Sequence, residues 1–341
     1  MKHLNWLHFT DLHFGIPSQE WLWPNYRSEL FDDLKRLRDS AAGPWDVVLF
    51  SGDLTQSGTK EQFEKLTEAL SQLWNHFASL ECTPYLLCVP GNHDLNRPSS
   101  TDAIVKAFKQ WHKDDDIKNE FWSSDSNQYR NVVTRCFANY NTWWSNVQIP
   151  KPDTIVSGLL PGDFSAIIDR AGFRLGIVGL NTAFLQITDE DYEGKLDFHE
   201  KQLIAVCAGD PPAWCEKLDV TLLMTHHGQQ WLHKSAEQRF LSEIYPPGRF
   251  FAHLFGHLHE PDSLNFSQGG APERRFRQGI SLFGLKTWGN SKQRVHGYTA
   301  GSFELSGAEG FERIWPRRLA PKMAGHSRLG PDTFYGMKIT V

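Results

Sequence analysis

The sequence predicts an α/β protein whose core contains parallel strands. Short apolar runs alternate with amphipathic segments of helical spacing in the first half of the chain, and the strand, helix, strand order then repeats. Connections of this kind join parallel strands through right-handed crossovers. A chain of 341 residues, 40% of them hydrophobic, is long enough for a full core in one large domain or two small ones.

The elements of the first half follow from the spacing of apolar side chains. The segment NWLHFT is a short apolar run, as expected of a buried strand, and DVVLF and YLLCV repeat the pattern. Between these runs apolar residues recur at helical spacing, as in Phe63, Leu66, Leu70 and Leu73. The predicted elements are strands at 5–10, 46–50 and 85–89 and helices around 30–37 and 59–80.

The alternation of strands and helices stops between residues 97 and 157. We interpret this polar and aromatic segment as a helical insertion beside or over the functional site. After Phe250 the segments are short, β-rich and punctuated by glycine, as in antiparallel strands. The run from Phe311 to Arg318 predicts an edge strand stopped by Pro316. The remaining predicted elements are helices at 103–111, 132–144 and 198–206 and strands at 164–168, 173–178 and 220–224.

We therefore expect one domain over residues 1–305, with the insertion at about 97–157. Residues 306–341 would form a C-terminal extension, which leads into a further domain if the chain is cut from a longer protein.

Composition limits the class of protein further. The formal net charge of −5 gives no overall attraction for nucleic acid, but residues 271–328 carry eleven lysines and arginines against four glutamates. That basic segment is either a solvated face of exposed strands or a surface for a polyanion, a further domain or a protein partner. Five scattered cysteines without a CxxC pair predict free thiols. No apolar run approaches the roughly 20 residues of a membrane span, so we expect a cytoplasmic protein without membrane contact.

Five short segments place metal-binding side chains where predicted strands end. Ligands gather at the carboxyl ends of strands in an open α/β sheet, so loops far apart in the sequence can converge there. Carboxylate and amide oxygens with imidazoles suit Mn, Fe or Zn better than a metal that prefers thiolates. In one such segment alone, the histidine would more often be a buried, hydrogen-bonded residue than a metal ligand. Five segments in this order are a strong signal for a metal site. They are Asp11-Leu12-His13, Gly52-Asp53, Gly91-Asn92-His93-Asp94, Thr225-His226-His227 and Gly256-His257-Leu258-His259.

Two of these segments contain ligand types that are two positions apart. Side chains with this spacing project to the same side of an extended strand. We therefore expect Asp11 with His13, and His257 with His259, to face one cavity from extended backbone.

The order of these segments resembles the calcineurin-like metallophosphoesterase superfamily, whose series is DxH, GDxx, GNHD/E, H and GHxH, over roughly residues 4–305. The forms SGDLTQSG and VPGNHD resemble the branch that holds cyclic-nucleotide phosphodiesterases and SbcD-like DNA repair nucleases. Phosphoprotein phosphatases of the superfamily usually carry an arginine in a GDxVDRG form, which this chain lacks. The resemblance implies a four-layer α/β/β/α sandwich of two mixed β-sheets flanked by helices.

The resemblance also implies a centre of two divalent ions, with one carboxylate shared between them. Two ions bring four positive charges and the two aspartates return only two negative ones, so the cavity attracts phosphate. A water that bridges both ions would be deprotonated near neutral pH and attack phosphorus in line. One set of ligands would be Asp11, His13, Asp53 and His259, and the other Asp53, Asn92, His226 and His257.

Three further residues take roles by the same resemblance. His93 matches the family's substrate-side histidine, which contacts the phosphate and would protonate the leaving oxygen, because an imidazolium can give up a proton at neutral pH. Asp94 would orient His93. His227 follows a ligand histidine directly and should point to the opposite side, where a substrate contact and a packing role are equally open. Tryptophans that could stack on a base, or else pack in the core, are Trp21, Trp23, Trp143, Trp144, Trp231 and Trp288.

We therefore expect a two-metal-dependent phosphoesterase. The leading hypothesis is a phosphodiesterase that hydrolyses a nucleotide or nucleic-acid phosphodiester by attack of a metal-bridging hydroxide. Phosphomonoester hydrolysis, including protein dephosphorylation, is the alternative. A non-catalytic binding module of the same fold is a third hypothesis, although such a module would typically lack ligands, and every expected ligand type is present.

Overall fold

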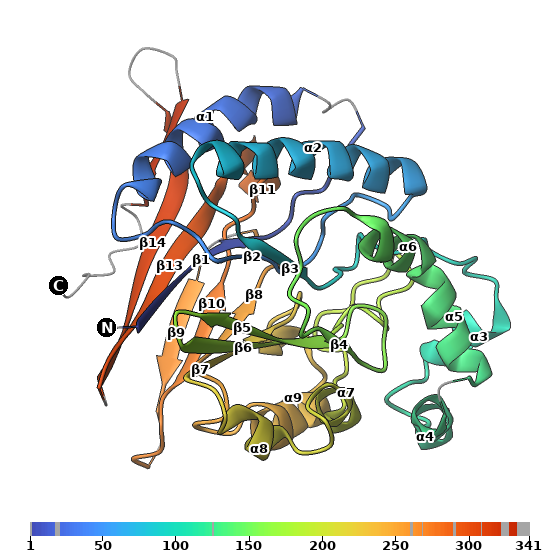
Figure 1. The fold of residues 1–341 in the computed structure, drawn as a ribbon. Helices are drawn as coiled ribbons and strands as arrows, with labels where there is room; N and C mark the ends of the chain where they lie inside the picture. Colours follow the sequence, from blue (N-terminus) through green and yellow to red (C-terminus); the bar gives the residue numbers. More distant parts are fainter. Residues whose placement is uncertain are drawn as a thin grey trace.

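The computed structural model describes residues 2–17, 21–124, 126–259, 262–267, 269–288, 291–307, 309–321 and 327–332. Two mixed sheets pack face to face, and helices cover their outer faces, as the resemblance implied (Figure 1). In Figure 1 the layers follow one another as α1 and α2, the first sheet, the second sheet, and α7 to α9. No helix in the described ranges is both long and apolar enough to cross a membrane.

The first sheet has the strand order β15-β14-β13-β1-β2-β3. β1, β2 and β3 are parallel, and the three later strands join the β1 side in antiparallel pairs. The bounds are β1 (Lys2–Phe9), β2 (Val47–Phe50), β3 (Tyr85–Cys88), β13 (Gly297–Ser306), β14 (Glu309–Pro321) and β15 (Ser327–Pro331).

The second sheet has the order β4-β5-β6-β7-β8-β10-β9. β8 pairs in parallel with both β7 and β10, so the antiparallel arrangement expected beyond Phe250 is wrong for β8. It is confirmed for β13, which is antiparallel to both β1 and β14. Only the outer pairs of the second sheet, β4 with β5, β5 with β6 and β9 with β10, are antiparallel. The bounds are β4 (Val156–Ser157), β5 (Phe164–Arg170), β6 (Phe173–Gly179), β7 (Val220–Met224), β8 (Ala252–Phe255), β9 (Asp262–Phe266) and β10 (Arg274–Gln278). A separate hairpin joins β11 (Gly284–Trp288) to β12 (Ser291–Val295).

Apolar side chains from both sheets meet in a buried cluster between them, which includes Trp6, Leu49, Ile177, Leu222 and Phe303. Each sheet therefore buries both of its faces. This explains why strands such as VVLF and VTLLM are apolar without alternation.

Helices α1 (Leu22–Arg38) and α2 (Lys60–Ser79) lie side by side over the outer face of the first sheet (Figure 1). α2 matches its predicted bounds because Thr59 caps it, with the side chain accepting a hydrogen bond from the backbone amide of Gln62. α1 begins well before the predicted stretch. Its first turn contains Pro24, which a helix tolerates there because amides of the first turn have no partner within the helix.

The segment 97–157 contains four helices, α3 (Ala103–Phe108), α4 (Asp115–Ser123), α5 (Gln128–Cys136) and α6 (Ala138–Asn146). The single helix predicted at 132–144 is wrong, because the chain breaks between α5 and α6 at Phe137. The indole of Trp143 donates to Thr67 on α2, at 3.0 Å, and that of Trp111 donates to Asp197, at 2.7 Å. These helices are therefore attached both to α2 and to the loop that follows β6.

Short helices cover the second sheet: α7 (Glu200–Val206), α8 (Pro211–Cys215), α9 (Lys234–Arg239), a 3₁₀ turn (Gln229–Trp231) and a π-helical turn (Phe240–Ile244). α7 is the helix predicted at 198–206, and its capping box between His199 and Gln202 fixes its start.

The chain beyond residue 305 adds strands to the first sheet. The edge strand predicted at 311–318 is wrong, because β14 continues past Pro316 and β15 pairs outside it. Arg317, from the basic segment, is buried against Asp33 on α1, with nitrogen–oxygen distances of 2.6 and 2.8 Å. Part of that segment's charge is thus used inside the fold. Residues 333–341, where the chain would lead into a further domain, lie outside the described residues.

Candidate metal centre

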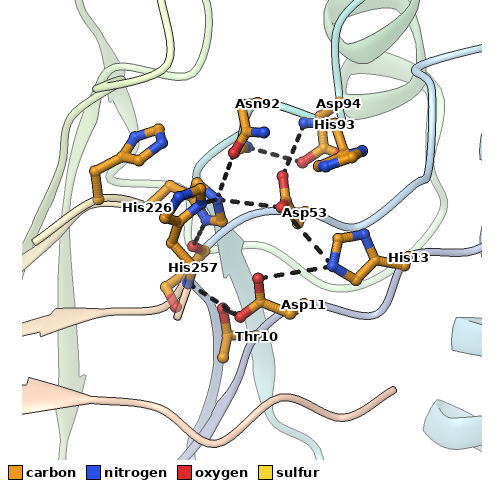
Figure 2. A network of polar contacts seen from close by, with 12 residues as sticks. Thr10, Asp11, His13, Asp53, Asn92, His93, Asp94, His226 and His257 are labelled. Atoms are coloured by element: carbon orange, nitrogen blue, oxygen red, sulfur yellow. Dashed lines mark hydrogen bonds and ion pairs between the residues drawn. The ribbon is translucent and has the colours of Figure 1, made fainter. Parts of the chain in front are cut away.

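Loops that follow β1, β2, β3, β7 and β8 converge at the carboxyl ends of these strands (Figure 2). All seven side chains predicted as metal ligands are gathered there, and their oxygen and nitrogen atoms form two groups around Asp53.

The first group surrounds Asp11 and His13. Nε2 of His13 lies 3.2 Å from Nε2 of His259, which in turn lies 3.5 Å from Oδ1 of Asp11. Oδ2 of Asp53 lies 3.8 Å from Nε2 of His13.

The second group surrounds Nε2 of His226. This nitrogen lies 3.0 Å from Oδ1 of Asn92, 3.1 Å from Nδ1 of His257 and 3.2 Å from Oδ2 of Asp53. The same carboxylate oxygen of Asp53 therefore faces both groups.

The distances of the second group, and the 3.2 Å between His13 and His259, fit coordination of a metal ion, whereas the 3.5 and 3.8 Å distances of the first group are somewhat longer. Nitrogen and oxygen ligands at about 2.1 Å from an ion lie roughly 3.0 to 3.4 Å from each other in tetrahedral or octahedral geometry. The orientation of the aspartates fits as well. Oδ2 of Asp11 accepts hydrogen bonds from Thr10 and the amide of His257, and Oδ1 of Asp53 accepts one from the amide of His93. The remaining oxygen of each carboxylate faces imidazole nitrogens, and that of Asp11 is buried with no hydrogen-bond donor in the part of the chain that the structure describes.

The backbone that carries these ligands is strained. Among the described residues, eight non-glycine residues have positive φ, and five of them belong to the centre: Asp11, His13, Asp53, His257 and His259. The expectation that the DxH and HxH segments are extended is therefore wrong. Their side chains converge because both residues of each pair adopt left-handed backbone in the loop after a strand.

Two glycines let the loops approach closely. A Cβ on Gly91 would lie 2.2 Å from Oδ1 of Asp53, and one on Gly52 would lie 2.5 Å from Nδ1 of His226. Gly52 also has a φ of +100°, which disfavours any other residue.

Hydrogen bonds orient two of the imidazoles. Nδ1 of His226 lies 2.8 Å from the carbonyl oxygen of Ser51, and Nδ1 of His93 lies 2.8 Å from that of Gln56. Because a carbonyl only accepts, each Nδ1 carries a proton and donates. Nε2 of His226 is then the atom that faces Asp53 and Asn92, and Nε2 of His93 is left for another partner.

Burial and charge set the protonation of the centre. Burial acts to raise the pKa of Asp53. The charge interaction with His226, and to a smaller extent that with His93, outweighs burial and holds this pKa well below its usual range. Burial acts to lower the pKa of His226, but Asp53 raises it to about 9. Burial lowers the pKa of His13 to about 4 and that of His257 to about 3. Asp53 and His226 therefore form an ionised pair between two neutral imidazoles.

The predicted role of Asp94 needs a correction, because it does not touch the His93 ring that Gln56 holds. Its carboxylate accepts hydrogen bonds from the backbone amides of Leu54, Thr55 and Gly91, at 2.7 to 3.1 Å, and from the Thr55 hydroxyl. Asp94 thus binds the loop after β2 to the loop after β3. Ser51 and Gln56 both lie in the segment SGDLTQSG, but they act through their backbone carbonyls, a role that side-chain types do not indicate.

The sequence predicts that His227 points to the side opposite His226, and this prediction is wrong. One ring nitrogen each of His226, His227 and His257 lie within 4.8 Å of one another, because Thr225 turns the backbone by donating to the carbonyl of His227. The ring of His227 is buried, and its Nδ1 lies 2.9 Å from the hydroxyl of Thr182. Among the described residues its Nε2 has no hydrogen-bond partner.

The tryptophans considered for base stacking differ in their surroundings. Trp143 is buried against Phe63, while Trp231 packs edge to face on His257 with ring centroids 4.1 Å apart. Trp23 contacts Phe14, which follows His13, with centroids 5.8 Å apart. The side chain of Trp288 lies outside the described residues.

Comparisons with known proteins place this fold and site in a family. The model for calcineurin-like phosphoesterases matches residues 4–261. A comparison with curated proteins gave no match. Solved structures with a similar fold include a dimetal phosphatase from Danio rerio, at 11% identity and a TM-score of 0.43 over 92% of this chain and 96% of that chain. A hypothetical protein from Thermus thermophilus is similar at 12% identity and a TM-score of 0.39, over 92% of this chain and 99% of that chain. GAP50 of Plasmodium is similar at 9% identity and a TM-score of 0.46, over 97% of this chain and 89% of that chain.

The family match spans most of the chain and all five segments that carry the predicted ligands. This protein therefore belongs to the calcineurin-like phosphoesterase family, whose fold binds a dimetal centre.

Proposed function

We propose that this protein is a two-metal phosphodiesterase that hydrolyses a nucleotide or nucleic-acid phosphodiester. The main support is the position of Asp53, whose Oδ2 lies 3.2 Å from Nε2 of His226 in one donor group and 3.8 Å from Nε2 of His13 in the other. A carboxylate placed in this way can serve two ions at once.

The proposed ligands follow from the two groups. Asp11, His13 and His259 would hold one ion and Asn92, His226 and His257 the other, with Asp53 shared. Mixed oxygen and imidazole donors suit Mn, Fe or Zn. When bound, two such ions supply positive charge to the phosphate oxygens and activate the attacking water.

His93 is the proposed general acid. Its Nδ1 proton is held by the carbonyl of Gln56, so Nε2 can carry a proton to the leaving oxygen. Its ring lies edge to face on that of His13, with centroids 4.9 Å apart, which keeps it beside the first donor group. Asp94 acts as a positioning residue, because it fixes the loop that presents the Gln56 carbonyl.

A diester is favoured over a monoester by the charge of the centre. A phosphomonoester dianion carries one more negative charge than a diester, and an additional cation would help to bind it. Ser57 stands where the GDxVDRG form has its arginine, so that position supplies no cation. Hydrolysis of a diester needs no such cation.

Turnover of bis-p-nitrophenyl phosphate and of p-nitrophenyl phosphate by metal-loaded protein tests this proposal. We expect kcat/KM to be higher for the diester by about tenfold or more, and activity to be lost after chelation. A preference for the monoester would favour the phosphomonoesterase hypothesis. Hydrolysis of neither compound, with fewer than two ions per chain, would favour a binding module.

A further inference from the structure

A pocket of about 340 Å³ lies directly beside the metal centre, on the side of His13. Three elements enclose it: the loop after β1, the start of α1 and one face of α2. Its volume is at the lower end of the range for ligand pockets, roughly 300 to 1,000 Å³. His13 contributes both to the pocket wall and to the first donor group, so a ligand in the pocket would adjoin the metal centre.

Aromatic rings form one wall of this pocket. Trp23 and Phe14 lie 5.8 Å apart, and both pack against Phe283, with centroids 6.3 and 6.0 Å away. Phe14 is fixed to the metal-binding loops, because its amide donates to the carbonyl of Leu54 at 3.0 Å. The aromatic wall is therefore held at a set position relative to Asp53.

A polar group of defined orientation, the amide of Gln72, lies beside Trp23. The indole of Trp23 donates to Oε1 of Gln72 at 2.9 Å, and Arg27 donates to the same oxygen. Both partners are donors only, so the oxygen of the amide must face them. Nε2 of Gln72 then lies on the other edge of the amide, and it has no acceptor within the described ranges.

The pocket also contains a hydrogen-bond acceptor, the carboxylate of Glu68. Lys65 and Glu68 line the pocket from the same face of α2 as Gln72, because residues three, four and seven apart on a helix lie on one side. The pocket thus offers an aromatic face, a fixed amide donor, and a carboxylate acceptor. A nucleobase, with a flat π-face and both acceptors and donors on its edge, matches this set.

We infer that this pocket binds the base of a nucleotide substrate on the leaving-group side of the scissile bond, an inference that rests on the proposed function. Trp23 stacks on the base, and Gln72 donates to its edge. The side is set by His93, the proposed general acid, because its ring packs on His13 and His13 lines the pocket. The leaving group is therefore released next to the pocket.

Binding of adenosine 5′-monophosphate and of ribose 5-phosphate to metal-loaded protein, measured by calorimetry, tests this inference. The two ligands share a phosphate and a ribose and differ in the base. Stacking of one base predicts a dissociation constant lower by about tenfold or more for adenosine 5′-monophosphate. Trp23→Leu and Gln72→Ala should each bring the ratio of the two constants closer to one.

Trp74→Leu is the matched control, because Trp74 is a partly buried tryptophan of α2 outside this pocket. It should leave the ratio unchanged, and thermal unfolding shows which variants are folded. Equal binding of the two ligands by the wild-type protein, or an unchanged ratio in folded Trp23→Leu and Gln72→Ala, would overturn the inference. Hydrolysis of bis-p-nitrophenyl phosphate separates the two claims. If the diester is cleaved but the two ligands bind equally, only the assignment of the pocket is wrong. If adenosine 5′-monophosphate binds more tightly but the diester is not cleaved, only the proposed function is wrong.

Discussion

The Asp53 carboxylate and the His226 imidazole form a buried pair, with Oδ2 of Asp53 3.2 Å from Nε2 of His226. The charge of Asp53 outweighs the burial that would lower the pKa of His226, and raises it to about 9. These two atoms are also proposed metal ligands. A metal ion that binds to Nε2 must therefore displace a proton from it, which couples metal binding to pH.

Asp53→Ala should abolish activity and weaken both metal sites, because both donor groups share the lost carboxylate. We expect a decrease in turnover of more than about a hundredfold and fewer than two ions per chain by elemental analysis. Asp153→Ala, at an exposed position, is the control and should retain metal and activity. Two ions retained in Asp53→Ala would contradict the shared ligand.

Removal and return of metal should change thermal stability in a pH-dependent way. A ligand at a thousand times its dissociation constant stabilises a protein by about 4 kcal/mol, so adding Mn²⁺ to chelated protein should raise Tm. The gain should be larger at pH 9 than at pH 6, because at pH 6 the His226 proton must first be displaced. Calorimetry at both pH values checks this, and an equal gain at both would argue against the coupling.

His93→Ala should keep both metals but slow turnover by about two to four orders of magnitude, if His93 is the general acid. The loss should be smaller for p-nitrophenol, which leaves readily without a proton, than for an alkoxide leaving group. His3→Ala, at an exposed site on β1, is the control. Rates close to those of the wild-type protein with a poor leaving group would exclude this role.

Asp94→Asn should lower stability by about 1–3 kcal/mol, because an amide cannot accept from every backbone donor that now bonds the carboxylate. Burial, followed by the charge of Asp53, raises the pKa of Asp94 to about 6. Turnover should fall as well, since the Gln56 carbonyl that holds His93 lies in the loop that Asp94 fixes. Urea unfolding together with rate measurements tests both effects. Unchanged stability would show that these hydrogen bonds contribute little.

Asp33→Asn should destabilise the fold by about 3 kcal/mol near neutral pH, since it leaves Arg317 buried without its charged partner. Burial acts to raise the pKa of Asp33, but the hydrogen bond from Arg317 outweighs it and lowers the pKa below 3.8. The stabilisation by ionised Asp33 is therefore complete above that value and is lost as the pH falls through the folded-state pKa.

The difference in unfolding free energy between the wild-type protein and Asp33→Asn should thus be constant above about pH 5 and shrink below about pH 4. Denaturant unfolding at several pH values measures it. Asp32→Asn, at the exposed neighbouring position, controls for the loss of charge on α1. A difference that grows toward low pH would contradict the sign of this linkage.

The sequence predicted the α/β class and the bounds of α2, because apolar spacing and the Thr59 cap are local signals. It failed at α1, β14 and the break at Phe137. In these places packing against other segments outweighs local preference: β15 covers β14, and the early turn of α1 packs against the loop after β1 through Trp23 and Phe14.

At the centre, the sequence by itself determined which chemical groups are present: two carboxylates, an amide and four imidazoles, carried by loops at strand ends. Only the tertiary structure decided how these groups are used. The left-handed backbone at Asp11 and His13, the carbonyls of Ser51 and Gln56 that select one imidazole tautomer, and the meeting of Trp23 with Gln72 all depend on residues distant in the sequence. Such contacts have no local signal, because they form only when the loops and helices pack together.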